Sequence, residues 1–162
     1  IIEGFKNVSN EYGCIFNADY SFHPKYLQNM FFKTKNFDFI FGSRYLKNGS
    51  SEDDDIITLI GNKCFSFFSK YFLQINISDI LFTYVLCDVQ KFNSLNLQSK
   101  DFRLCIELPF KISRHFSYSE ISMKERARYA GEKNVNVIKD GFLILTEQIK
   151  SFFVLLTYIF KK

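Results

Sequence analysis

Short apolar runs alternate with amphipathic stretches in the first half of the chain. Residues 12–16 and 37–41 are apolar and rich in aromatic or β-branched side chains, which is typical of buried strands. Between them, Pro24 suits the first turn of a helix that residues 25–35 continue. This alternation of strand and helix predicts an α/β fold with parallel strand pairing.

The second half of the chain is more varied. Residues 47–55 are polar and predict a loop, and residues 56–73 have the apolar spacing of a helix. Residues 75–89 fit either a strand or a helix followed by a turn. The remaining elements are expected to be a helix over 102–110, an edge strand within 117–128, and a last helix that Asp140-Gly141 opens.

Length and composition are consistent with one domain that has apolar side chains to spare. The chain has 162 residues, of which 19% are aromatic, with 21 Phe and no Trp. Such an excess supplies a core and leaves apolar surface for further protein or a membrane to cover. The net charge of +4 suits phosphate-bearing ligands or anionic lipid. Nucleic acid is disfavoured because Lys and Arg form no dense stripe.

The cysteines indicate a reducing compartment. All four are far apart in apolar surroundings, and no CxxC pair occurs, which disfavours a zinc site. With no recognisable signal peptide, we expect buried, reduced thiols in a cytoplasmic protein, either free or at the cytoplasmic face of a membrane.

Two polar motifs follow the first two predicted strands. Asn17-Ala18-Asp19 and His23-Pro24 come after the first strand, and Gly42-Ser43-Arg44-Tyr45 ends the second. Ligands of α/β proteins bind at the carboxyl ends of strands, so these motifs predict a metal and phosphate site.

The ordered set of motifs resembles the second half of the catalytic domain of family 2 glycosyltransferases, particularly the polyprenyl-phosphate sugar synthases of the dolichyl-phosphate mannose synthase type. The resemblance covers about residues 12–150, and its later motifs are Gly61-Asn62, Ser78-Asp79, Glu107, Arg126 to Lys133 and Lys139-Asp140-Gly141.

The resemblance implies an incomplete GT-A-like α/β fold, with a mixed, mostly parallel sheet flanked by helices. Residues 1–150 would be a partial catalytic domain, and 151–162 the end of an amphipathic or membrane-proximal helix. The implied reaction moves a sugar from a nucleoside diphosphate sugar to a polyprenyl phosphate or glycan acceptor, in cell-envelope glycan synthesis, assisted by Mg²⁺ or Mn²⁺.

The resemblance assigns roles on the donor side. Asp19 would be the main metal ligand, and Asn17, which replaces the family's first Asp, would weaken metal binding. The alternative for Asp19 is a turn or helix-capping role. Arg44 would bind phosphate or else pair with the acidic loop. Arg128 and Lys133 would close over the phosphates or belong to a solvated loop.

Asp79 and Glu107 are the implied acceptor-side residues. Asp79 would act as a general base or orient other groups, because an acceptor phosphate is already anionic. Glu107 is either functional or the polar side of an amphipathic helix.

Departures from the family keep a second hypothesis open. The family's opening Pro-x-Tyr/Phe-Asn-Glu strand, which holds the nucleotide, has no counterpart, and Val85 stands where an Arg is expected. These differences favour a non-catalytic remnant or partner subunit.

A third hypothesis is a lipid-surface module anchored by the last helix. Residues 151–160 alone are too short to span a bilayer. The Phe-rich stretch over 65–72 is expected to be core.

Overall fold

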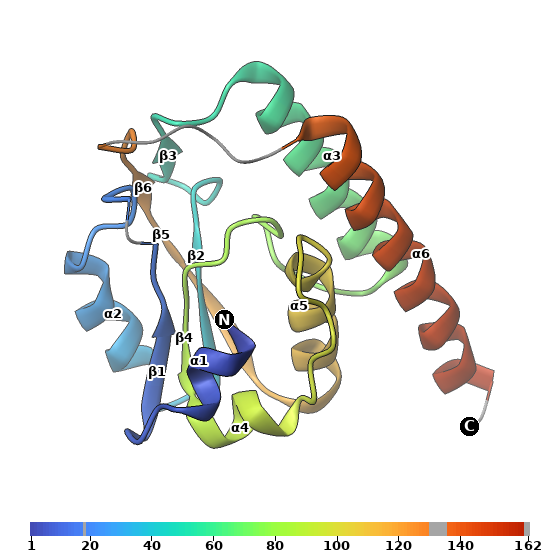
Figure 1. Ribbon diagram of the computed structural model, residues 1–162, viewed down its shortest axis with the longest axis horizontal. Coiled ribbons are helices and arrows are strands. Elements are labelled where there is room, and N and C mark those ends of the chain that lie inside the picture. Colours follow the sequence, from blue (N-terminus) through green and yellow to red (C-terminus); the bar gives the residue numbers. More distant parts are fainter. Residues whose placement is uncertain (18, 130–135, 161–162) are drawn as a thin grey trace.

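The computed structural model describes residues 1–17, 19–129 and 136–160 and shows a mixed sheet flanked by helices (Figure 1). Four strands form the main sheet, in the spatial order β1 (Tyr12–Ile15), β4 (Val85–Asp88), β2 (Phe39–Ser43) and β5 (Tyr118–Ser122). A second, small sheet pairs β3 (Ser50–Ser51) with β6 (Lys124–Glu125).

The main sheet is mixed, as predicted, but its pairing is not mostly parallel. Only β2 and β5 are parallel, with Phe39 opposite Tyr118, whereas β4 runs antiparallel to both β1 and β2. The prediction of parallel pairing was wrong because β4 enters between β1 and β2 and runs against them. The strands β1, β2 and β5 still point the same way, so their carboxyl ends meet at one edge.

The helices lie in layers on either side of the sheet. In Figure 1, α2 (Lys25–Lys33) lies on one side, and α5 (Leu104–His115) lies on the other. Beyond α5, α3 (Ile56–Phe72) and α6 (Val137–Phe160) run side by side and contact each other. Two short helices, α1 (Ile2–Lys6) and α4 (Val89–Ser94), pack together.

Alternation along the strands divides the core in two. On the α5 side, Phe39 and Phe41 belong to a cluster that includes Ile106 and Ile112. On the α2 side, Ile40 packs in a second cluster with Met30. Successive strand residues point to opposite faces, so one apolar run such as 37–41 supplies both clusters.

The predicted elements match the structure closely at several boundaries. The expected strand over 12–16 and the helix over 56–73 each end one residue earlier. Asp55 begins α3 because its side chain accepts a hydrogen bond of 2.7 Å from the Thr58 amide. The ambiguous segment 75–89 contains one strand, β4, after a largely irregular stretch.

The last helix is longer than expected. It begins at Val137, before Asp140, and has 24 residues. The whole helix is long and apolar enough to cross a membrane, whereas the prediction considered only the 151–160 tail, which is too short. Length and composition do not separate such a helix from the core helix of a soluble protein.

Gly42 lies where the end of β2 meets side chains from other segments. A Cβ there would collide with the Met123 sulfur and approach the Phe82 ring to 3.1 Å. We expect Gly42→Ala to lower the free energy of unfolding by about 1–3 kcal/mol through overpacking. Gly61→Ala is the matched control, because its Cβ meets nothing within 4 Å inside a helix, and it should stabilise by ~0.5–1 kcal/mol. Urea denaturation measures both, and equal effects would contradict the packing described.

Candidate functional site

Two chain segments that are distant in sequence meet at the carboxyl edge of the main sheet. The turn after β1 and the segment after β6 are joined by two backbone hydrogen bonds. The Tyr129 amide donates to the Asp19 carbonyl at 3.0 Å, and the Arg126 amide donates to the Ser21 carbonyl at 3.1 Å. The predicted metal-binding turn and the predicted basic segment are therefore neighbours.

The Asp19 carboxylate is held by its own turn. Its Oδ1 accepts hydrogen bonds from the Ser21 amide at 3.0 Å and the Ser21 hydroxyl at 2.6 Å. Partial burial alone would raise the pKa of Asp19, but these hydrogen bonds and the charge of Arg128 lower it below its usual value. The carboxylate is thus ionised at neutral pH and is both a turn residue and a candidate ligand.

Asp19 fits a cation that is shared with a phosphate group. Among the described hydrogen bonds, none occupies Oδ2, and Asn17 nearby is exposed. No cluster of three or more His, Cys, Asp or Glu side chains that could hold a metal occurs within the described ranges. A Mg²⁺ bound through one or two carboxylates, with phosphate and water completing its shell, needs no more protein ligands than this.

Arg128 lies near Asp19 and pairs with the acidic loop. Its guanidinium donates to the Asp53 carboxylate at 2.9 Å, and the charges of Asp53 and Asp19 help to raise its pKa. The structure therefore brings Asp19 and Arg128 together, whereas Lys133, the other predicted phosphate ligand, lies outside the described residues.

Arg44 is buried and forms a fork with Asp79. Its Nε donates to Asp79 Oδ2 at 2.8 Å and its Nη2 donates to Oδ1 at 3.0 Å, while the Arg44 backbone amide also donates to Oδ2 at 3.0 Å. The Arg44 side chain is 7% exposed and that of Asp79 is fully buried. Planar, bidentate pairing of this kind is the strongest form of the ion pair.

Two more carboxylates complete the surroundings of Arg44. Its Nη1 donates to Asp54 at 3.0 Å and to Glu125 at 2.9 Å, and both partners are also buried. Burial would lower the pKa of Arg44, but Asp79 and Glu125 raise it well above its usual value. Arg44 thus pairs with the acidic loop, the alternative that the sequence left open, and its guanidinium does not face a phosphate site.

Asp79 orients neighbouring groups. Besides Arg44, its Oδ1 accepts a hydrogen bond of 2.7 Å from the Asn62 amide nitrogen of α3. A base must reach the proton that it removes. The Asp79 side chain is fully buried and accepts from two donors, which fits the orienting role that the sequence also offered, while the general-base role stays a prediction.

Glu107 anchors the loop that precedes α5. Its carboxylate accepts from the backbone amides of Gln98 and Ser99, at 2.9 and 2.7 Å, and pairs with Lys111 at 2.8 Å. Burial alone would raise the pKa of Glu107, but Lys111 and the loop donors lower it to about 2. These contacts give the buried carboxylate a structural role, while its catalytic role stays a prediction.

Sequence reasoning missed several polar residues of this edge. Tyr45 donates to Asp54 at 2.7 Å, and Glu120 accepts from the Ser78 hydroxyl at 2.8 Å. Burial raises the pKa of Glu120, against the lowering effect of Ser78. The signal for Asp54 was the acidic run at 52–55, but nothing in the local pattern marks Glu120 or Glu125 as buried.

No model of a known protein family matches the chain.

We expect Arg44→Lys to destabilise the protein by about 3 kcal/mol or more. Lysine cannot form the bidentate ion pair with Asp79, and it leaves the other carboxylates around Arg44 with too few hydrogen-bond donors. Arg103→Lys is the matched control, because Arg103 pairs with Asp101 at the surface and should change little. Guanidinium denaturation compares the two, and a stability loss for Arg44→Lys no larger than for Arg103→Lys would refute the described network.

Glu107 should contribute a pH-dependent share of the stability. Its pKa is lowered in the folded state, so the contribution is present above about 4.5, the ordinary value for Glu, and is lost as the pH falls toward 2. We expect a loss on the order of 2 kcal/mol over that window. Glu107→Gln should flatten this part of the curve in acid unfolding, whereas Glu3→Gln, at an exposed site, should leave it unchanged. Parallel curves for all three proteins would exclude the assignment.

Proposed function

We propose that the chain belongs to a family 2 glycosyltransferase of GT-A-like fold, which transfers a sugar from a nucleoside diphosphate sugar to a polyprenyl phosphate or glycan acceptor. The observation that carries the proposal is the neighbouring placement of Asp19 and Arg128 at the carboxyl edge of the sheet. Two motifs far apart in the sequence, each matched to the donor site by resemblance, supply an ionised carboxylate and a guanidinium to one place.

These two residues suit the leaving group of sugar transfer. As the acceptor oxygen bonds to the anomeric carbon, the bond from that carbon to the donor's diphosphate breaks, and negative charge builds up on the departing diphosphate. Arg128 can offset that charge, since a guanidinium is permanently charged and offers paired donors to phosphate. A divalent cation at Asp19 would neutralise diphosphate oxygens as a Lewis acid.

The acceptor determines whether a base is needed. A polyprenyl phosphate attacks through an oxygen that is already anionic, so the buried Asp79 need not remove a proton. A glycan acceptor attacks through a hydroxyl and would need a base, a role for which Asp79 and Glu107 are poorly placed. The placement of these two residues favours the phosphate acceptor, met at the cytoplasmic face of a membrane.

The alternative is a non-catalytic partner subunit or remnant of such an enzyme. It is favoured by the internal contacts of Arg44, Asp79 and Glu107 and by Asn17, which stands in place of the family's Asp. Such a chain would keep the fold without binding a donor.

Binding of donor with metal separates the two proposals. We expect calorimetric titration with UDP- and GDP-sugars to show binding that requires Mn²⁺, and Asp19→Asn to weaken it at least about tenfold, because the amide loses the charge that holds the cation. Asp101→Asn removes an acid from a surface pair and serves as the control.

Arg128→Gln should weaken the same binding, and its thermal unfolding must be compared with the parent because Arg128 also pairs with Asp53. Absence of any metal-dependent binding by the folded chain would favour the non-catalytic alternative.

A further inference from the structure

The helix α3 buries polar side chains and exposes apolar ones, while Phe65 and Phe68 pack against the core from partly buried positions. Its three buried residues are Asn62, Ser66 and Ser69. The exposed apolar positions recur at helical spacing on the other side and are Ile56, Ile57, Ile60, Phe67, Tyr71 and Phe72. This is the reverse of the arrangement expected for a helix that covers a core from the solvent side.

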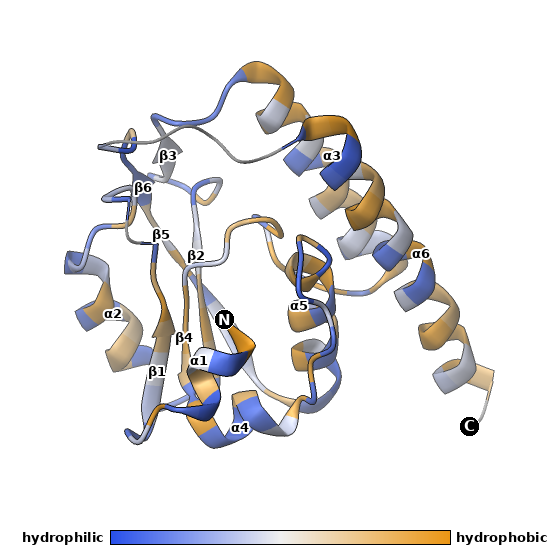
Figure 2. Ribbon diagram, viewed as in Figure 1, coloured by the Kyte–Doolittle hydropathy of each residue, from blue (hydrophilic) through white to orange (hydrophobic). Residues whose placement is uncertain are grey.

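The neighbouring helix α6 repeats this reversal. Four of its six buried residues are polar: Asp140, Glu147, Gln148 and Ser151. Its exposed apolar residues include Ile138, Phe142, Ile149, Phe153 and Phe160. Figure 2 shows α3 and α6 with long hydrophobic stretches, side by side at the outer edge of the molecule. The exposed surfaces of these two adjacent helices are together named here the α3–α6 face.

Several of the inward polar residues are hydrogen-bonded, although the Gln148 side-chain oxygen is buried without a partner among the described residues. The Gln148 amide nitrogen donates to the Ser69 hydroxyl at 2.9 Å and to the Phe65 carbonyl at 2.8 Å, tying α6 to α3. The Ser66 hydroxyl accepts from the Ile80 amide at 3.1 Å. Rotating either helix to hide its apolar side would break these buried hydrogen bonds.

The exposed charge on the α3–α6 face is positive, although Lys150 pairs with the buried Glu147 at 3.1 Å. The exposed charged residues within the bounds of α3 and α6 are the lysines Lys63, Lys70, Lys139 and Lys150. The acids of α6, Asp140 and Glu147, are buried, and α3 contains no acid. Apolar side chains flanked by lysines complement an anionic lipid surface. A second copy of the same face would bring like charges together.

We propose that the α3–α6 face docks on an anionic membrane, with its apolar side chains inserted and its lysines at the headgroups. Phe67 and Tyr71 are then lipid contacts, whereas Phe65 and Phe68 pack against the core, so the expectation that the 65–72 stretch is core is confirmed only in part. The face lies along the surface and does not cross the bilayer, because crossing would carry Asp140, Glu147 and Gln148 into hydrocarbon. The inference is independent of glycosyl transfer.

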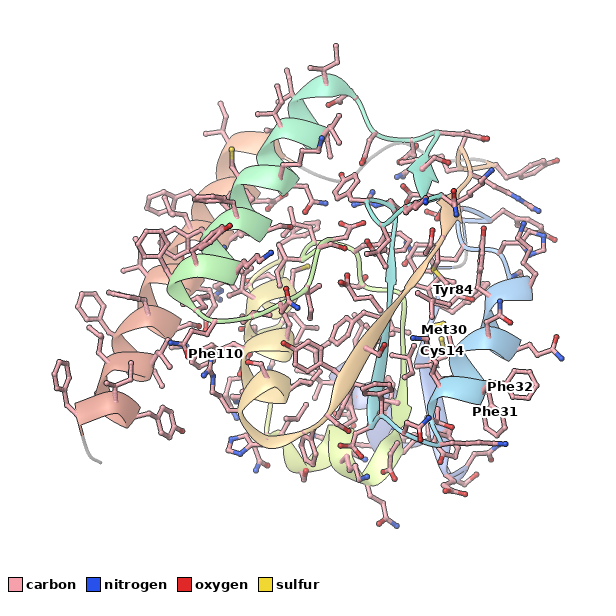
Figure 3. All side chains as sticks on the ribbon, turned by 180° about the vertical axis from the view of Figure 1, so that it is seen from behind. Cys14, Met30, Phe31, Phe32, Tyr84 and Phe110 are labelled. Carbon is pink, nitrogen blue, oxygen red and sulfur yellow. The ribbon has the colours of Figure 1, made fainter. Side chains whose placement is uncertain are left out.

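The absence of tryptophan allows a site-specific test. Phe67→Trp on α3 and Phe153→Trp on α6 each install a single fluorophore on the α3–α6 face, since these side chains are 60% and 61% exposed. Phe32→Trp on α2 is the matched control, being 56% exposed on the side away from α3 and α6 (Figure 3). We expect vesicles of phosphatidylcholine and phosphatidylglycerol to shift the emission of the first two to shorter wavelength and leave the third unchanged.

Co-sedimentation with the same vesicles measures affinity. Phe67→Glu should lower the lipid-bound fraction at least about tenfold, because a carboxylate replaces an inserted ring. Phe32→Glu should bind as the parent does, and circular dichroism verifies that both variants are folded. Vesicles of phosphatidylcholine alone should bind less than the anionic ones.

Three results would overturn the proposal. An equal response of all three tryptophans would show non-specific adsorption, and a response of Phe153→Trp alone would restrict contact to α6. A folded chain that ignores vesicles and instead forms dimers, which Phe67→Glu dissociates, would assign the α3–α6 face to a second copy.

Discussion

The structure depends on a buried arginine that is surrounded by three carboxylates. Removing a charge from water costs several kcal/mol in practice, so Arg44 is tolerated only because Asp79, Asp54 and Glu125 accept its donors. These partners come from the loop after α3, the loop before it, and β6. One side chain at the end of β2 thereby fixes three segments that otherwise have little regular structure.

This network also determines which residues remain for chemistry. Arginine, aspartate and asparagine in familiar motifs suggest a phosphate site, yet here Arg44, Asp79 and Asn62 satisfy one another. These buried side chains lie beneath the turns at the sheet edge. Asp19 and Arg128 are the predicted site residues that lie near each other and remain partly exposed.

Local pattern was sufficient for several elements and insufficient for their partners. The strands near residues 12 and 37 and the helix from residue 56 were predictable because apolar spacing and caps act over a few residues. The antiparallel insertion of β4 was not, since pairing is decided by long-range packing. In the same way, helical spacing revealed that α3 has an apolar side, but not that this side faces outward. Asp19 and Arg128 were found by motif, whereas the pairing of Arg44 with Glu125 required the fold.

Asn62 connects the outer helix α3 to the buried network around Arg44. Its side chain leaves the inner side of α3 and ends on Asp79, which in turn holds Arg44. Because a helix is stiff, a small rotation or slide of α3 would move the Asn62 amide and weaken its hydrogen bond to Asp79, which pairs with Arg44. A displacement of α3 would therefore change the surroundings of Asp79 and Arg44 at the end of β2.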